Sequence, residues 1–95
     1  MVETAKSVHS MEELRRYVAD TLSSIENLRA DQFQLSQRVL HRGGRFCGIH
    51  FCLQGPRDLR LSAIWETDQN SILFYDSCGR RMQRTKLAHS PSTPK

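Results

Sequence analysis

The chain has 95 residues, of which 38% are hydrophobic and 25% are charged. A chain of this length supports one hydrophobic core, and its apolar content is too high for a disordered protein. No apolar run approaches the roughly 20 residues that a membrane-spanning helix needs, so we expect no membrane partner. Three cysteines and the lack of a secretory signal pattern in the sequence predict a reduced, cytoplasmic setting.

Basic residues are concentrated in the later part of the sequence. Residues 1–32 hold four basic and six acidic side chains, a net charge of −2, whereas residues 33–95 hold ten basic and four acidic side chains, a net charge of +6. Most of these basic residues are arginines, whose planar guanidinium suits carboxylates and phosphates. The asymmetry favours an acidic protein surface or a nucleic acid as partner, although the same charges also suit a solvated, soluble surface.

One amphipathic helix is predicted near the N-terminus. Ser10 and Glu13 have the spacing of a capping box, and an apolar stripe at helical spacing follows them. The stripe comprises Met11, Leu14, Val18, Leu22, Ile25 and Leu28. The pattern predicts a helix over residues 10–30. Residues 1–9 are predicted to be a flexible N-terminus and residues 88–95 a disordered C-terminal tail, on either side of a single domain at 10–87.

After Asp31 the apolar period changes from 3.6 to 2, and turn-forming residues recur about every ten to twelve positions. This pattern predicts an antiparallel meander with strands at 33–41, 45–54, 59–66, 71–75 and 80–87. The predicted fold class is therefore α+β: one N-terminal helix packed on a twisted four- to five-stranded antiparallel sheet, either open or closed toward a barrel.

Pairing the predicted strands assigns their side chains to two faces. With an odd-length loop at the double glycine and a three-residue loop after Gln54, Phe51 lies opposite Leu35 on one side and Leu61 on the other. A four-residue loop at 67–70 places Trp65 opposite Ile72. The resulting face is the predicted core beneath the helix, and it comprises Phe33, Leu35, Val39, Cys47, Ile49, Phe51, Leu53, Leu59, Leu61, Ala63, Trp65, Ile72 and Phe74.

The second face of the predicted sheet is half apolar and half polar, and the sequence offers no second helix to cover it. Its side chains are those of Phe46, Gly48, His50, Cys52, Arg60, Ser62, Ile64, Glu66, Leu73 and Tyr75. Three arrangements suit such a face: closure of a barrel that buries it, face-to-face packing of two copies, or binding of a partner. A glycine in the middle of a strand, as at Gly48, is typical of a bend or a close backbone approach.

Patterns typical of catalysis or metal binding are weak in this sequence. In Cys47-x-x-His50-x-Cys52, alternation along a strand puts Cys47 on the opposite face from the other two, so the zinc pattern is split. His50 and Cys52 share a face, but no third residue suggests itself to orient them as a nucleophile pair. We therefore expect no metal, no cofactor and no enzymatic activity.

The second face gives the leading hypothesis for function. We expect a small basic binding module that acts through protein–protein interaction or self-association, because arginine and aromatic side chains are enriched at protein interfaces. The alternative is binding of RNA or single-stranded DNA, in which bases stack on aromatic rings beside basic side chains. The candidate surface for either function comprises Phe46, His50, Arg60, Ile64, Leu73, Tyr75, Arg42, Arg45, Arg80 and Arg81.

Overall fold

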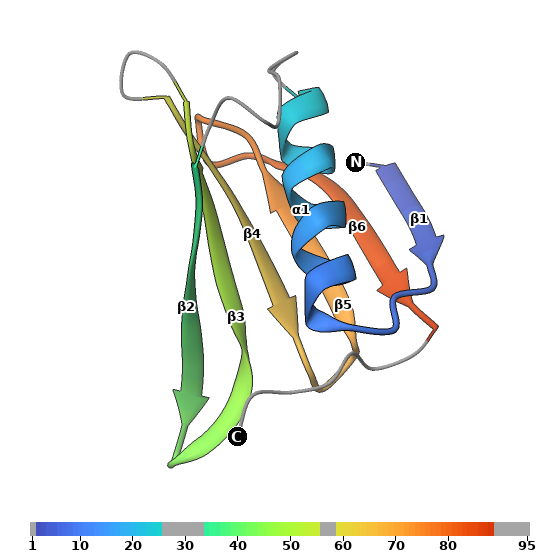
Figure 1. Ribbon diagram of the computed structural model, residues 1–95. Helices are drawn as coiled ribbons and strands as arrows, with labels where there is room; N and C mark the ends of the chain where they lie inside the picture. The colour runs from blue at the N-terminus through green and yellow to red at the C-terminus, as the bar shows by residue number, and fades with distance from the viewer. Residues whose placement is uncertain (1, 26–33, 56–58, 89–95) are drawn as a thin grey trace.

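A computed structural model describes residues 2–25, 34–55 and 59–88 of the chain. Over these residues it contains one helix and six strands, which form two layers (Figure 1). In chain order the elements are β1 (Val2–Lys6), α1 (Met11–Ile25), β2 (Gln34–Arg42), β3 (Arg45–Gln54), β4 (Arg60–Glu66), β5 (Ser71–Tyr75) and β6 (Arg81–Leu87). The predicted α+β class and the five meander strands are confirmed. The predictions for residues 26–30 and for the tail at 89–95 fall outside the described residues.

The strands form a single sheet in the order β1-β6-β5-β4-β3-β2. Strands β2 to β6 pair as an antiparallel meander, and β1 pairs in parallel with β6. Because β1 and β2 are the two edges and do not pair with each other, the sheet is open, and the barrel alternative is wrong. Helix α1 packs on one face of this sheet (Figure 1).

Strand β1 was not predicted, because residues 1–9 have no apolar alternation and were expected to be flexible. Every residue of β1 is exposed, yet the strand is fixed by its backbone pairing with β6. A polar cluster reinforces this pairing: the Thr85 hydroxyl shares hydrogen bonds of 2.8 Å with the hydroxyls of Thr4 and Tyr17. The strand is therefore stabilised by hydrogen bonds rather than by burial of its own side chains.

The predicted capping box begins α1. The Ser10 hydroxyl accepts a hydrogen bond from the Glu13 amide at 3.1 Å, and the Glu13 carboxylate accepts one from the His9 amide at 3.0 Å rather than from that of Ser10. The apolar stripe of the helix faces the sheet, with Leu14, Val18 and Leu22 fully buried. Burial of this stripe holds the helix in place, since isolated helices of this length are marginal in water.

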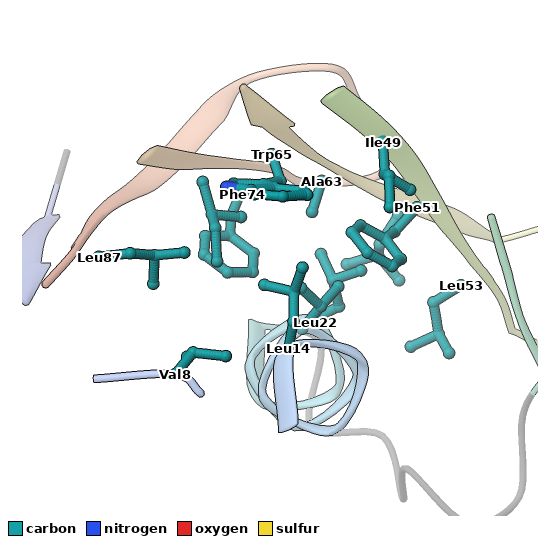
Figure 2. Packing of buried hydrophobic residues seen from close by; sticks show 13 residues of the cluster. Val8, Leu14, Leu22, Ile49, Phe51, Leu53, Ala63, Trp65, Phe74 and Leu87 are labelled. Carbon is teal, nitrogen blue, oxygen red and sulfur yellow. The ribbon is translucent and has the colours of Figure 1, made fainter. Parts of the chain in front are cut away.

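The core lies between α1 and the facing side of the sheet (Figure 2). Its buried apolar residues are Val8, Leu14, Val18, Leu22, Ile49, Phe51, Leu53, Leu61, Ala63, Trp65, Ile72, Phe74 and Leu87. The sheet residues in this list confirm most of the predicted core face. Leu35 and Leu59 pack against it while partly buried, and Phe33 lies outside the described residues.

The predicted register between β4 and β5 is confirmed, whereas the predicted registers of β3 with its two neighbours are wrong. Trp65 pairs with Ile72 as predicted, whereas Phe51 pairs with Ala63 rather than with Leu61. Phe51 likewise pairs with Gln37 rather than with Leu35, so both predicted registers of β3 are displaced by two residues. An error of two residues leaves each side chain on its predicted face, because side chains alternate along a strand with a period of two.

The β2–β3 hairpin differs from the prediction for a local reason. Its loop is the two residues Gly43 and Gly44, which have φ angles of 59° and 79°, as a tight hairpin turn with two positive φ angles requires. Leu40 pairs with Gly48 but His41 pairs with Phe46, so Cys47 is an extra residue in β3. Because of this β-bulge, the β3 side chains that precede Cys47 point to the opposite face from the one that strict alternation predicts.

Candidate functional site

The face of the sheet opposite α1 is the candidate site, and we call it the open face. The register places five of its side chains in one row across β2 to β6: Arg38, His50, Ile64, Leu73 and Arg84. Ile64 and Leu73 form the apolar centre of the row and are only half-buried. Within residues 2–25, 34–55 and 59–88, no element packs over this face.

A second row lies beside the first and ends in a cation–aromatic pair. It runs through Ser36, Cys52, Ser62, Tyr75 and Arg81. The Arg81 guanidinium carbon lies 5.7 Å from the centroid of the Tyr75 ring, and its Nη2 donates to the Tyr75 hydroxyl at 3.3 Å. The register shift after Phe74 makes this possible, because it pairs Tyr75 with Arg81 and leaves Met82 as the extra residue.

The open face carries more positive than negative charge. Its acidic side chains are Glu3 and Glu66, and its basic side chains are Arg38, Arg42, Arg45, Arg60, Arg81, Arg84 and Lys86. In the described part of the chain the ion pairs are Arg16–Glu12 and Arg80–Asp76, and neither involves these residues. The positive charge of the open face is therefore not compensated by close ion pairs.

Two of these basic side chains are positioned by uncharged groups. Arg84 Nη2 donates to Oε1 of Gln69 at 2.7 Å, and Lys86 Nζ donates to the backbone oxygen of Gln69 at 2.8 Å. Gln69 belongs to the turn between β4 and β5. Because an amide oxygen orients a cation without neutralising it, both charges stay available to a partner.

Phe46 does not belong to the open face, contrary to the prediction. Its ring centroid lies 5.8 Å from that of the fully buried Trp65, and Phe46 packs against the core cluster. The bulge at Cys47 is the cause, because one extra residue turns the preceding side chain toward the other face. The other predicted apolar and aromatic site residues, Ile64, Leu73 and Tyr75, and the predicted His50 and Arg60 do lie on the open face.

The predicted arginines of the turns are separated into two groups. Arg42 and Arg45 face each other at the β2–β3 turn, at the same end of the sheet as the β4–β5 turn (Figure 1). Arg80 and Arg81 follow the β5–β6 turn at the opposite end (Figure 1). The four side chains therefore do not form one patch with each other: alternation along the hairpin puts Arg42 and Arg45 on the open face at one end of the sheet, and Arg81 joins that face at the other end through Tyr75.

Arg80 has a structural role in its turn. Its Nε lies 3.3 Å from the Asp76 carboxylate, which also accepts hydrogen bonds of 2.9 Å from the amides of Cys78 and Arg80. The pKa of Asp76 is lowered mainly by the hydrogen bond from the Arg80 amide. Partial desolvation of the carboxyl raises the pKa, whereas the Cys78 amide and the Arg80 charge lower it further. Arg80 thus stabilises the β5–β6 turn.

Sequence reasoning missed three basic residues of the open face: Arg38, Arg84 and Lys86. Arg84 and Lys86 are on β6, which was predicted as a strand but without a register to its partner. Arg38 is at a position of β2 whose side chain points to the open face, and alternation of side chains along the strand was enough to predict this. These three residues could have been found by extending the predicted strand pairing to β2 and β6.

The three cysteines are free thiols: Cys47 and Cys52 are half-buried and Cys78 is exposed. Among the described residues, no group of three or more histidine, cysteine or acidic side chains is arranged to hold a metal ion. The described helix is also too short and too polar to cross a membrane.

No protein-family model, no curated protein and no solved structure matches this chain. The geometry of the open face is therefore the basis for a functional proposal.

Proposed function

We propose that the chain is a protein-interaction module whose open face binds an acidic surface of another protein. The observation that carries the proposal is the row in which Arg38 and Arg84 lie on either side of His50, Ile64 and Leu73. Protein interfaces combine an apolar centre with a polar rim in which arginine is enriched. The row has this composition, and no described element covers it.

The charge of the face favours an acidic partner over a second copy. Two open faces packed against each other would bring like-charged rims together, which costs free energy when the charges are desolvated. An acidic surface instead neutralises Arg38, Arg81 and Arg84 and gains the apolar contact with Ile64 and Leu73. The proposal therefore favours hetero-association over self-association on this face.

A nucleic acid is the competing partner, and the Arg81–Tyr75 pair is the observation that favours it. Single strands bind where several aromatic rings offer stacking surfaces along a basic groove. On the open face Tyr75 and His50 are the ring-bearing side chains, Arg81 lies against the Tyr75 ring, and Phe46 packs with the core. With these few stacking surfaces, an acidic protein is the better match.

The test is an NMR titration of ¹⁵N-labelled protein with three probes: poly-glutamate, a random copolymer of glutamate and tyrosine, and a random-sequence single-stranded RNA. We expect the copolymer to bind most tightly, because it offers both negative charge and apolar contact. The shifted amides should belong to the strands that form the row, β2 to β6. Arg84→Glu should abolish this binding, whereas Arg16→Glu, the same charge change on the exposed side of α1, should weaken it little.

Two results would overturn the proposal. One is tighter binding of RNA with a steep salt dependence, which indicates phosphate contacts. The other is a dimer whose mass depends on concentration and is lost in Arg84→Glu, which indicates self-association through the open face. Thermal unfolding of each variant establishes that a loss of binding is not a loss of fold.

A further inference from the structure

We propose that the free edge of β2 binds an extended acidic segment of a partner protein, which adds to the sheet as a further antiparallel strand. Edge strands present unpaired backbone N–H and C=O groups, and peptide recognition by strand addition uses these groups. The site uses the outward backbone groups of β2, which the open face does not use, and it shares with that face only the side chains of Arg38 and Arg42.

The two edges of the sheet differ in length and in charge. Strand β1 has five residues and carries one acidic and one basic side chain, Glu3 and Lys6. Strand β2 has nine residues and carries Arg38 and Arg42 but no acidic residue. Its length is enough for an added strand to make several backbone hydrogen bonds. The β2 edge is therefore the better acceptor of the two.

One contact from α1 identifies which backbone groups of β2 point away from the sheet. Arg15 Nη2 donates to the backbone oxygen of Leu35 at 2.7 Å, and Arg15 Nη1 donates to Oε1 of Gln37. In an antiparallel strand the N–H and C=O of one residue point to the same side, and the side alternates along the strand. The outward groups are therefore those of Leu35, Gln37, Val39 and His41.

A contact from α1 occupies the first part of this edge. Within the described residues, Leu35 is the one residue of β2 whose outward backbone group has a partner, the Arg15 guanidinium. To the groups that the structure describes, the outward N–H and C=O from Gln37 to the end of β2 make no such hydrogen bond. Arg15 therefore blocks pairing of a further strand at the Leu35 end of β2, and the part of the edge that can accept a strand runs from Gln37 toward Arg42.

Charge selects the kind of strand that this edge accepts. Two copies of β2 paired antiparallel over their full length would place Arg38 directly opposite Arg38 of the second copy, and like charges opposite each other are destabilising. A strand with alternating acidic side chains replaces that repulsion with attraction to Arg38 and Arg42. The edge thus disfavours self-pairing and favours an acidic extended segment.

The test uses a nine-residue synthetic peptide of alternating valine and glutamate. Two matched peptides serve as controls: one has lysine in place of glutamate, and one is N-methylated at every residue, so that it keeps the charges but has no backbone N–H to donate. Binding is measured by ¹⁵N NMR and by amide hydrogen exchange of the full chain. We expect the valine–glutamate peptide to slow exchange of the Gln37 and Val39 amides.

N-methylation should weaken binding by at least about tenfold, which corresponds to about 1.4 kcal/mol and hence to one or two lost hydrogen bonds. The lysine peptide should not bind. Arg38→Glu should reduce the affinity, and Arg15→Ala should raise it because the Leu35 carbonyl becomes free to pair.

Equal binding of the N-methylated peptide would overturn the proposal, because charge alone would then hold the peptide. Protection of amides in β5 or β6 instead of β2 would also overturn it. Arg84→Glu separates this site from the open face: it should leave the protection at Val39 unchanged while it abolishes binding of the glutamate–tyrosine copolymer.

Discussion

The indole N–H of Trp65 donates a hydrogen bond of 3.0 Å to the side-chain oxygen of Asn70. Asn70 lies in the β4–β5 turn with a φ of 48°, a left-handed conformation that asparagine tolerates better than most residues. Its backbone oxygen accepts from the Leu87 amide at 2.9 Å. These contacts connect the core, the turn and the end of β6, so the largest core side chain also helps to position a strand that is two places away in the sheet.

Replacing Trp65 with alanine should destabilise the fold by about 3–5 kcal/mol, because the change leaves a large cavity in the core. Urea unfolding followed by circular dichroism measures this loss. Asn70→Gly is the matched control: it keeps the left-handed backbone but removes the hydrogen bond to the indole, and should cost only about 1 kcal/mol. An unchanged midpoint for Trp65→Ala would show that the core is assigned incorrectly.

Gly48→Ala should destabilise the protein by about 2–3 kcal/mol through overpacking. A Cβ at this position would collide with the backbone oxygen of Trp65 on the neighbouring strand, and a backbone atom cannot move aside as a flexible side chain can. Gly43→Ala is the comparison, since a Cβ there meets no atom within 4 Å and only its positive φ is unfavourable. If the two variants unfold at the same urea concentration, the close approach of β3 and β4 is not as described.

Thr85→Val should lower the free energy of unfolding by about 1–2 kcal/mol, although valine has nearly the same shape. The Thr85 hydroxyl is fully buried and is hydrogen-bonded to Thr4, to Tyr17 and to the side-chain amide of Gln83. The loss should also speed amide hydrogen exchange in β1, which depends on this cluster. Exchange rates in β1 that equal those of the wild type would refute the role given to the cluster.

The stability of the protein should fall in acid partly through Asp76. The pKa of this carboxyl is lowered in the folded state, so its contribution is fully present above the unfolded pKa of about 3.9 and is lost as the pH falls through the folded pKa. Asp76→Asn removes the titration. Wild type should therefore be more stable than Asp76→Asn at about pH 6, and the difference should shrink toward about pH 2. Urea midpoints at the two pH values give the comparison, and a constant difference would contradict the prediction.

Much of the open face was predictable from the sequence, and the reason is visible at Ile64 and Leu73. Both lie on strands whose alternation is regular, and they pair directly, as the predicted loop of four residues between β4 and β5 requires. Phe46 was placed on the wrong face because one inserted residue, Cys47, reverses the alternation. A bulge leaves little mark in the sequence, since it depends on how the two strands of the hairpin meet.

The sequence by itself determined the helix at Met11–Ile25, the five strands of the meander and the division of most of their side chains between two faces. These features follow from hydrophobic periodicity, which is local and survives a register error of two residues. Only the tertiary structure decided the parallel addition of β1 to β6 and the bulge at Cys47. The bulge depends on how the two strands of the hairpin meet, and the parallel pairing depends on contacts between residues far apart in the chain, such as Thr4 and Thr85, whose hydrogen bond has no counterpart in the local pattern.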